Sequence, residues 1–147
     1  MKKSMGGFTL IELIAVIVIL GLLSAFALPR FSGIEGQARV ASINGLAGSV
    51  RSAAALAHSL QIAQNLASNA SISMEGRTIA MINGYPTAGN GGIEDTLTDT
   101  TGYTHTDATG VYSVASAGTP ANCRVTYVAP TAANTQPTIT VVTTGCP

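Results

Sequence analysis

The apolar and polar positions divide this chain of 147 residues into three stretches. In the first, Leu13–Leu28 forms an apolar run that contains no charged residue, and Glu12 stands directly before it. With its flanks the run covers about 21 residues, which is about the length that a helix needs to cross a bilayer. We therefore predict a transmembrane helix over residues 8–28, preceded by a short segment of residues 1–7.

The second stretch, residues 29–67, has the pattern of an amphipathic helix. Apolar residues recur there at steps of three and four, which places them on one helical face: Val40, Ile43, Leu46, Val50, Ala53, Ala57 and Leu60. Together the two patterns predict one helix from Phe8 to about Leu66. Gly21 and Pro29 are its weak points, because glycine lowers helix stability and proline removes a backbone donor and clashes with the preceding turn.

The third stretch, residues 68–147, is rich in Ser, Thr, Asn and Gly, and its apolar runs are short. Residues that favour strands predict four short ones: Ile79–Ile82, Val111–Ala115, Arg124–Ala129 and Thr138–Thr143. Ile93–Leu97 is predicted as a single helical turn, and Gly84-Tyr85-Pro86 as a turn. The predicted fold class is α+β, with the second half of the long helix packed on a small antiparallel sheet.

Cys123 and Cys146 are the only cysteines of the chain. A hairpin that turns near Asn134 places them opposite each other, at a Cα separation that a disulfide can bridge. The envelope side of the membrane is oxidising, so we expect the bond to form. By the chain-entropy estimate, a closed loop of about 24 residues contributes roughly 3 kcal/mol. Two free buried thiols are the alternative.

Glu12 needs a partner, because an unpaired carboxylate at membrane depth costs several kcal/mol. A cut after Gly7 creates a new α-amino group on Phe8, within one helical turn of Glu12. A neighbouring copy of the chain can present that amine to the carboxylate. The segment then indicates a subunit that is stored in the membrane and polymerises.

Two other interpretations of the N-terminus remain open. A secretory signal peptide would use Lys2 and Lys3 as its basic region and Ala25-Phe26-Ala27 as its cleavage site, but Glu12 within the apolar segment disfavours this. A plain membrane anchor, with its N-terminus in the cytoplasm, fits the two lysines and leaves Glu12 unexplained.

The residues Lys2-Lys3, Gly7, Phe8, Thr9 and Glu12, followed by Gly21 and Pro29, resemble the N-terminus of a type IV prepilin. The resemblance implies cleavage between Gly7 and Phe8 and N-methylation of Phe8 by a membrane prepilin peptidase. It implies storage in the inner membrane, with the N-terminus cytoplasmic and the globular part periplasmic. An inner-membrane assembly platform then extracts the subunit into an extracellular homopolymer. In some filaments of this type the helix segment that corresponds to Gly21–Pro29 melts, and this sequence permits such melting without requiring it.

Two further motifs are similar to those of the mannose-sensitive haemagglutinin (MSHA) pilin group. One is Gly84-Tyr85-Pro86-Thr87-Ala88 followed by Gly92-Ile93, and the other runs from Cys123-Arg124-Val125-Thr126-Tyr127 to Gly145-Cys146. The resemblance implies a pilus that serves surface attachment, and a disulfide that encloses the C-terminal segment is also common in type IV pilins. In any family, Tyr85-Pro86 also serves simply to fix a turn.

Charge and composition restrict the other functions. Charged residues make up 10% of the chain, and loss of Lys2 and Lys3 leaves five basic against seven acidic residues, a net charge of −2. No basic patch remains, so we expect no nucleic-acid partner. His58 and His105 have no nucleophile at a recognisable spacing, so we expect neither catalysis nor a cofactor.

Possible metal and glycan sites give only weak signals. Glu94, Asp95 and Asp99 lack the spacing of a calcium loop. We expect them to cap a helix or to face solvent rather than to bind a metal. Asn69-Ala70-Ser71 matches a glycosylation sequon, a short motif that is common by chance.

Several functions remain to be distinguished. The first hypothesis is a structural pilus subunit of the MSHA-like type, and the second is a pseudopilin of a type II secretion system, which shares the same N-terminus. The resemblance favours the pilin, because major pseudopilins usually lack the C-terminal disulfide and carry a calcium loop. A DNA-uptake pilin and a membrane-anchored enzyme are more remote alternatives.

Overall fold

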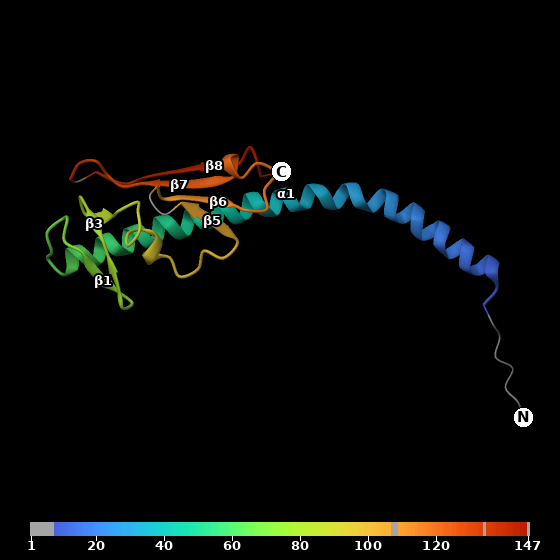
Figure 1. The fold of residues 1–147 in the computed structure, drawn as a ribbon, viewed down its shortest axis with the longest axis horizontal. Helices are drawn as coiled ribbons and strands as arrows, with labels where there is room; N and C mark the ends of the chain where they lie inside the picture. Colours follow the sequence, from blue (N-terminus) through green and yellow to red (C-terminus); the bar gives the residue numbers. More distant parts are fainter. Residues whose placement is uncertain (1–7, 107–108, 134, 147) are drawn as a thin grey trace, which may run out of the picture. The chain divides into compact units, whose positions relative to one another are not determined.

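The computed structural model describes residues 8–106, 109–133 and 135–146, and Figure 1 shows its ribbon. Helix α1 spans Leu10–Ala63 without interruption. The chain divides into two compact units, Met1–Glu35 and Gly36–Pro147. The second unit contains both clusters of buried apolar residues and every strand found among the described residues, which confirms the predicted α+β class.

Helix α1 ends at Ala63, a few residues before the predicted end near Leu66. Asn65 adopts a positive φ of 52°, and its N–H donates to the carbonyl of Ile62, while the N–H of Leu66 donates to the carbonyl of Gln61. This is the Schellman arrangement that closes helices, here with Asn in the left-handed position that glycine usually takes. The periodic apolar pattern does not contain this stop signal, so the predicted boundary was wrong.

Two short hairpins follow the helix. β1 (Ile72–Met74) pairs with β2 (Arg77–Ile79), and β3 (Met81–Ile82) pairs with β4 (Tyr85–Pro86). Each is closed by two residues with positive φ, Glu75-Gly76 and Asn83-Gly84. Such two-residue turns match the twist of the flanking strands, and Asn-Gly is a strong signal for them.

The hairpins correct two predictions. The predicted strand Ile79–Ile82 is interrupted at Ala80, whose N–H donates to Gly91 and whose carbonyl accepts from Thr87. The predicted turn at Gly84-Tyr85-Pro86 lies one step too late, because the turn is at Asn83-Gly84 and Tyr85-Pro86 is strand β4. The physical reason is that Asn83 and Gly84 both tolerate the positive φ that a two-residue hairpin turn requires, so the turn forms at this pair.

The main sheet has the order β5-β6-β7-β8, and all its neighbouring strands are antiparallel. The bounds are Tyr103–Thr106 for β5, Val111–Val114 for β6, Arg124–Val128 for β7 and Thr138–Val142 for β8. Strands β6, β7 and β8 agree with the predicted strands to within one residue at each end. Strand β5 was not predicted, because its Thr-rich sequence lies between turn residues.

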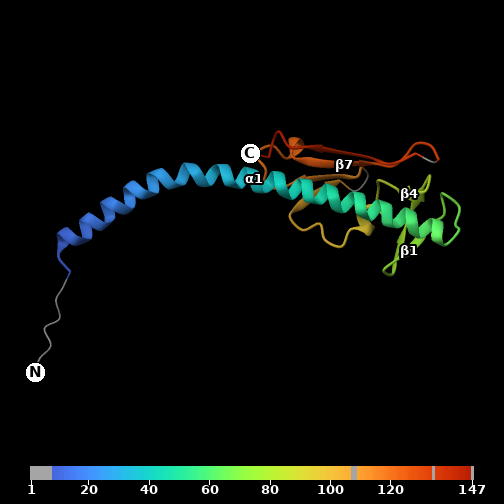
Figure 2. The same ribbon diagram turned by 180° about the vertical axis from the view of Figure 1, so that it is seen from behind.

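Two single turns of 3₁₀ helix lie in the connections, η1 (Glu94–Thr96) and η2 (Pro120–Asn122). η1 lies within the predicted turn Ile93–Leu97. Figures 1 and 2, seen from opposite sides, both place the main sheet alongside the second half of α1.

The main core lies between that half of α1 and the sheet. The predicted apolar face of the helix is confirmed: Ile43, Leu46, Val50 and Ala57 are buried, and Val40, Ala53 and Leu60 are partly buried against them. From the sheet, Tyr112, Val125 and Tyr127 are at most 1% exposed. The phenol of Tyr127 donates a hydrogen bond of 2.7 Å to the carbonyl of Pro86. Burial raises the pKa of both tyrosines, and the nearby Glu94 and Asp95 add to the effect at Tyr112.

Candidate functional site

The start of α1 carries the residues that the sequence singles out for assembly. Thr9 precedes the first helical residue, and Glu12 lies in the first turn. The Glu12 carboxylate accepts a hydrogen bond of 2.9 Å from the backbone N–H of Thr9 and one of 2.8 Å from its hydroxyl. The Thr9 hydroxyl in turn accepts from the N–H of Glu12 at 3.4 Å. This reciprocal pattern is a capping box.

The capping box gives Glu12 a partner within its own subunit. The carboxylate is therefore satisfied by two donors before any second copy arrives, which the prediction of an obligatory partner in another subunit did not foresee. The sequence contained the signal, because Thr-x-x-Glu before an apolar run is the pattern of a capping box. Cleavage before Phe8 would leave the Thr9 amide and hydroxyl in place, so this arrangement is compatible with a mature chain.

The cleavage site itself lies partly outside the described residues. Gly7, with Lys2 and Lys3, belongs to the undescribed N-terminal segment, whereas Phe8 is described and its side chain is 86% exposed. Processing between Gly7 and Phe8 thus stays a prediction.

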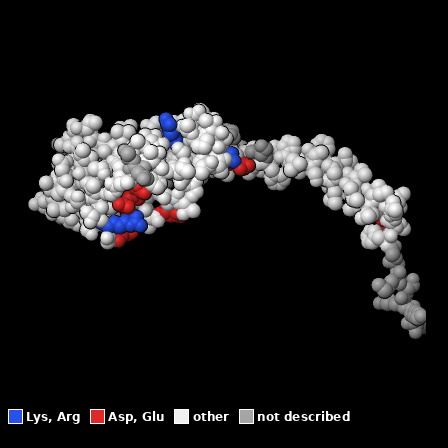
Figure 3. Space-filling view, in the orientation of Figure 1, with Lys and Arg blue, Asp and Glu red and all other residues white. Residues whose placement is uncertain are grey.

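The first half of α1 exposes a long series of large apolar side chains. Those more than half exposed include Leu13, Ile17, Val18, Leu20, Leu22, Leu23, Phe26 and Leu28. By length and composition this helix can cross a membrane. In Figure 3 the charged side chains are few, and most lie on the globular unit. Apolar surface of this extent in water is a strong driving force for burial in lipid or in other helices.

Gly21 and Pro29 lie inside α1, and the helix continues through both in this structure. A Cβ atom added at Gly21 meets nothing within 4 Å, so no contact in this subunit requires glycine there. Gly21 and Pro29 permit the helix to melt between them in a filament and do not require it.

Comparison with known proteins bears directly on this segment. Residues 2–28 match the family model described as the prokaryotic N-terminal methylation motif. The chain carries a prepilin-type N-terminal methylation motif. It is also similar to the type IV narrow pilus major component PilA5 of Thermus thermophilus, with 55% identity over 51 residues. That match covers 35% of this chain and 44% of the relative's length, and none of the solved structures matches the chain.

The motif and the architecture agree. A methylation motif at the head of an apolar helix, followed by a small antiparallel sheet packed on the second half of that helix, is the type IV pilin-like architecture that the sequence predicted.

The predicted disulfide between Cys123 and Cys146 is present, with Cα atoms 4.9 Å apart. Its predicted geometry was wrong. Strands β7 and β8 pair Arg124 with Val142, and this register continued by one residue would place Thr143 opposite Cys123. The chain instead turns after Thr143, whose carbonyl accepts from the N–H of Cys146 at 3.2 Å.

The C-terminal segment is held at several other points. The N–H of Gly145 donates to Asn122, and the carbonyl of Gly145 accepts from Thr119 at 3.2 Å. A Cβ at position 145 would lie 2.5 Å from the Thr119 carbonyl, so only glycine fits. On the other side, a guanidinium nitrogen of Arg39 on α1 donates to the carbonyl of Cys146 at 3.2 Å.

The motif that resembles MSHA pilins has a structural role in this chain. Gly84 has a φ of +93° in its hairpin, and a Cβ at Gly92 would collide with the Thr87 carbonyl. The N–H of Ile93 donates to that same carbonyl at 2.8 Å. These glycines therefore fix the loop, whereas Tyr85-Pro86, which the plain interpretation expected to fix a turn, forms strand β4.

Both histidines have local partners. His58 stacks on Tyr85, with ring centroids 4.2 Å apart and planes within 7° of each other. Its Nδ1 lies 2.6 Å from the carbonyl of Gly84, and because a carbonyl can only accept, Nδ1 carries the proton. His105 contacts the carboxylate of Glu94 at 2.8 Å. The histidines thus hold η1 and the second hairpin in place.

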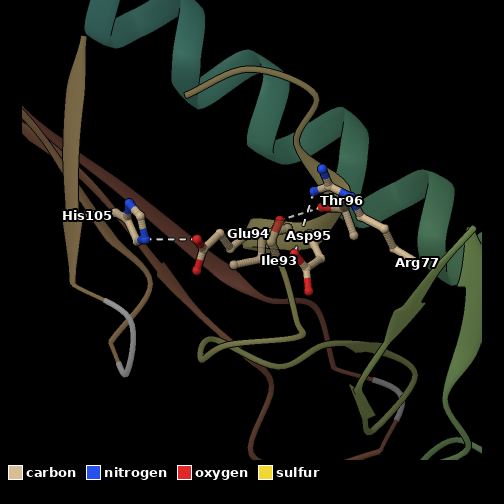
Figure 4. A network of polar contacts seen from close by, with 6 residues as sticks. All are labelled: Arg77, Ile93, Glu94, Asp95, Thr96 and His105. Atoms are coloured by element: carbon tan, nitrogen blue, oxygen red, sulfur yellow. Dashed lines mark hydrogen bonds and ion pairs between the residues drawn. The ribbon is translucent and has the colours of Figure 1, made fainter. Parts of the chain in front are cut away.

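Acidic residues around η1 form a small polar network (Figure 4). Glu94 contacts His105 on β5, and Asp95 contacts Arg77 on β2 at 3.5 Å. The hydroxyl of Thr96 donates to the carbonyl of Ile93 at 2.6 Å. Asp99 accepts from the N–H of Thr101 at 2.7 Å, and hydrogen bonding to Thr101 lowers its pKa. In the described part of the chain, no group of three or more His, Cys, Asp or Glu residues is placed to hold a metal ion.

A hollow of about 440 Å³ opens beside the His58–Tyr85 stack. Its lining is mostly uncharged: Gln61, Ile62, Leu66, Ser68, Asn83, Gly84, Ala133, Thr135 and Gln136. Part of this lining is already committed to the fold. The amide of Gln61 donates to the carbonyls of Ala67 and Ala70, and that of Asn83 donates to Pro130.

Proposed function

We propose that this protein is a structural subunit of a type IV pilus of the MSHA-like type, which serves surface adhesion and is not an enzyme. The observation that supports this most directly is the methylation motif over residues 2–28, at the head of an exposed apolar helix. The match to a major component of a type IV pilus supports the same function.

In this proposal the subunit waits in the inner membrane, with its N-terminus in the cytoplasm and its globular unit in the periplasm. Prepilin peptidase removes residues 1–7 and methylates the amine of Phe8. The assembly platform then moves the apolar helix from lipid into the filament core, where the helices of other subunits cover the same surface. Transfer between two apolar surroundings costs little hydrophobic energy, which is why the subunit can leave the membrane.

In the filament, the charge of Glu12 meets the Phe8 amine of a neighbouring subunit. The attraction is much stronger in the low dielectric of the core than in water. A slip by one helical turn separates the charges by about 5 Å, so the pair sets the axial register. The Thr9 capping box holds the carboxylate until that partner arrives.

The alternative is a pseudopilin of a type II secretion system, which has the same N-terminal motif. The Cys123–Cys146 bond favours the pilin, on the resemblance described above. The two differ in what they build, a surface appendage or a short periplasmic piston.

The test is to shear filaments from cells that express the chain at its native level. Intact-mass analysis should find a chain that begins at Phe8 with one added methyl group, and electron microscopy should find long surface filaments. Adhesion that mannose inhibits would support the MSHA-like subtype. Secretion defects without surface filaments would favour the pseudopilin, and a chain that begins at Leu28 would establish a signal peptide.

A further inference from the structure

Strand β8 is an unprotected edge of the main sheet. It is the last strand in the order β5-β6-β7-β8, and its sequence Thr138–Val142 has no charged residue, proline or glycine. Natural proteins usually protect such an edge with a charge, a proline or a bulge, because it can pair with another chain. The opposite edge, β5, carries His105, whose Nε2 lies 2.8 Å from the carboxylate of Glu94.

The hydrogen bonds of β7 establish which backbone groups of β8 face outward. The carbonyl of Cys123 accepts from Val114, and the N–H of Tyr127 donates to Gly110, so these odd-numbered positions face β6. Alternate residues of a strand point their backbone groups to opposite sides. The even-numbered residues of β7 therefore face β8, where their partners are Thr138, Thr140 and Val142.

Ile139 and Val141 consequently direct their N–H and C=O groups away from β7, at the free edge. Among the described residues, no backbone hydrogen bond outside the ladder involves either of them. Their side chains pack against the main core, whereas Thr138 and Thr140 are exposed on the other face.

We propose that β8 pairs antiparallel with β8 of a second copy of this chain, with the two-fold axis at Thr140. In this register Ile139 meets Val141 of the second copy, and Val141 meets its Ile139. The outward N–H and C=O groups of Ile139 and Val141 on each strand then all form hydrogen bonds to the other strand. A register shifted by one pair to centre on Ile139 would place Val141 opposite Pro137, which has no N–H to donate.

The side chains also match in this register. On the core side, the apolar Ile139 and Val141 are neighbours across the new ladder. On the outer side, Thr140 faces Thr140, a cross-strand pair whose hydroxyls can hydrogen-bond. No like charges meet on the paired strands, and the nearest charge on β7, Arg124, lies opposite Val142 on its own sheet.

The symmetry decides which copy can be the partner, if the filament proposal holds. Strands β7 and β8 run beside residues 36–63 of α1 (Figures 1 and 2), so a two-fold pair points its two helices in opposite directions. Subunits of one filament are added head to tail by the same operation and all point one way. The partner therefore belongs to a second filament of opposite direction, as when filaments from two facing cells meet. The inferred role of β8 is to join filaments and so to join cells.

A crosslink tests the geometry in whole filaments. Paired residues without mutual hydrogen bonds have Cα atoms about 4.5 Å apart, within disulfide range. Thr140→Cys should give a reducible dimer under mild oxidation, with a 140–140 linkage identified by mass spectrometry. Thr138→Cys is the matched control and should give none, because its partner is Val142 of the second copy. Mixed Thr138→Cys and Val142→Cys filaments should crosslink.

A charge swap tests the function. Thr140→Lys and Thr140→Glu should each lose aggregation of cells, because like charges face each other on the axis, and a mixture of the two strains should regain it. Thr140 is exposed, so neither change disturbs the core. Normal filaments that show no 140–140 linkage above the Thr138→Cys control, or Thr140→Lys cells that aggregate like wild type, would overturn the strand-pairing proposal. Absence of wild-type filaments would instead contradict the proposed pilus function.

Discussion

Arg39 on α1 donates a hydrogen bond of 3.2 Å to the carbonyl oxygen of Cys146, 107 residues later in the chain. The bond joins the long helix directly to the residue that closes the disulfide with Cys123. The C-terminal segment is therefore attached at two points. The Arg39 hydrogen bond joins it to α1, and the disulfide joins it to Cys123, the residue directly before β7.

Arg39→Met should lower the free energy of unfolding by about 1.5–3 kcal/mol, the usual contribution of a hydrogen bond to a charged group. Methionine keeps much of the apolar volume, so the change reports mainly on the polar contact. Thermal unfolding followed by circular dichroism measures the effect. Arg51→Met, at an exposed position of the same helix, is the control and should shift stability by no more than about 0.5 kcal/mol. Equal effects of the two changes would argue against the anchor.

Cys146→Ser should destabilise the chain by roughly 3 kcal/mol, because the unfolded chain regains the entropy of the open loop. Filament yield should fall with it. Thiol alkylation under non-reducing denaturing conditions measures the bond in the wild type. Two alkylated cysteines in mature wild-type protein would refute a role for the disulfide.

Gly7→Val should leave a full-length precursor in the membrane and abolish filaments. The expected reason is that the peptidase, which cuts before Phe8, has no room for a branched side chain at the preceding residue. Immunoblots of membrane fractions distinguish precursor from mature chain by size. Normal processing of this variant would place the cleavage elsewhere.

Glu12→Val should be cleaved and yet fail to assemble, and Glu12→Gln decides the reason. Glutamine can replace glutamate in a capping box, so Glu12→Gln keeps the helix cap and removes only the charge. If the charge sets the register, Glu12→Gln should also fail to polymerise.

Thr9→Val tests the opposite case, because it weakens the helix cap and keeps the charge of Glu12. It removes the hydroxyl that bonds Glu12 and should cost about 1 kcal/mol of cap stability while filaments still form. Filament yield and the ratio of cleaved to uncleaved chain are the measurements. Normal assembly of Glu12→Gln together with failure of Thr9→Val would show that capping, and not charge pairing, is the function of Glu12.

Stability should fall as the pH rises above about 10. Burial raises the pKa of Tyr112 and Tyr127 above their usual value of 10.0, so the folded chain keeps phenolic protons that the unfolded chain releases. Tyr127→Phe should be less stable at neutral pH, because the Pro86 carbonyl loses its donor, but its loss of stability above pH 10 should be smaller. Denaturant unfolding across about pH 8–11 measures both effects, and an unchanged slope would contradict the assignment to Tyr127.

The sequence by itself determined the features that depend on local pattern. The apolar run, the three-and-four spacing from Val40 to Leu60, and the Thr- and Val-rich strands each follow from the period of side chains along one element. The methylation motif over residues 2–28 is contiguous, so it too is visible without a fold. The Thr9–Glu12 cap and the Asn83-Gly84 turn are encoded just as locally, because each depends on a short contiguous motif.

Only the tertiary structure decided how distant segments meet. Strand register placed Thr143 rather than Cys146 across from Cys123, and a turn held by Gly145 brought the cysteines together. The contact between Arg39 and Cys146, and the outward edge of β8, likewise depend on which segments become neighbours in space. These follow from long-range packing and hydrogen bonding, in which each partner is chosen by the rest of the fold, and no local pattern records that choice.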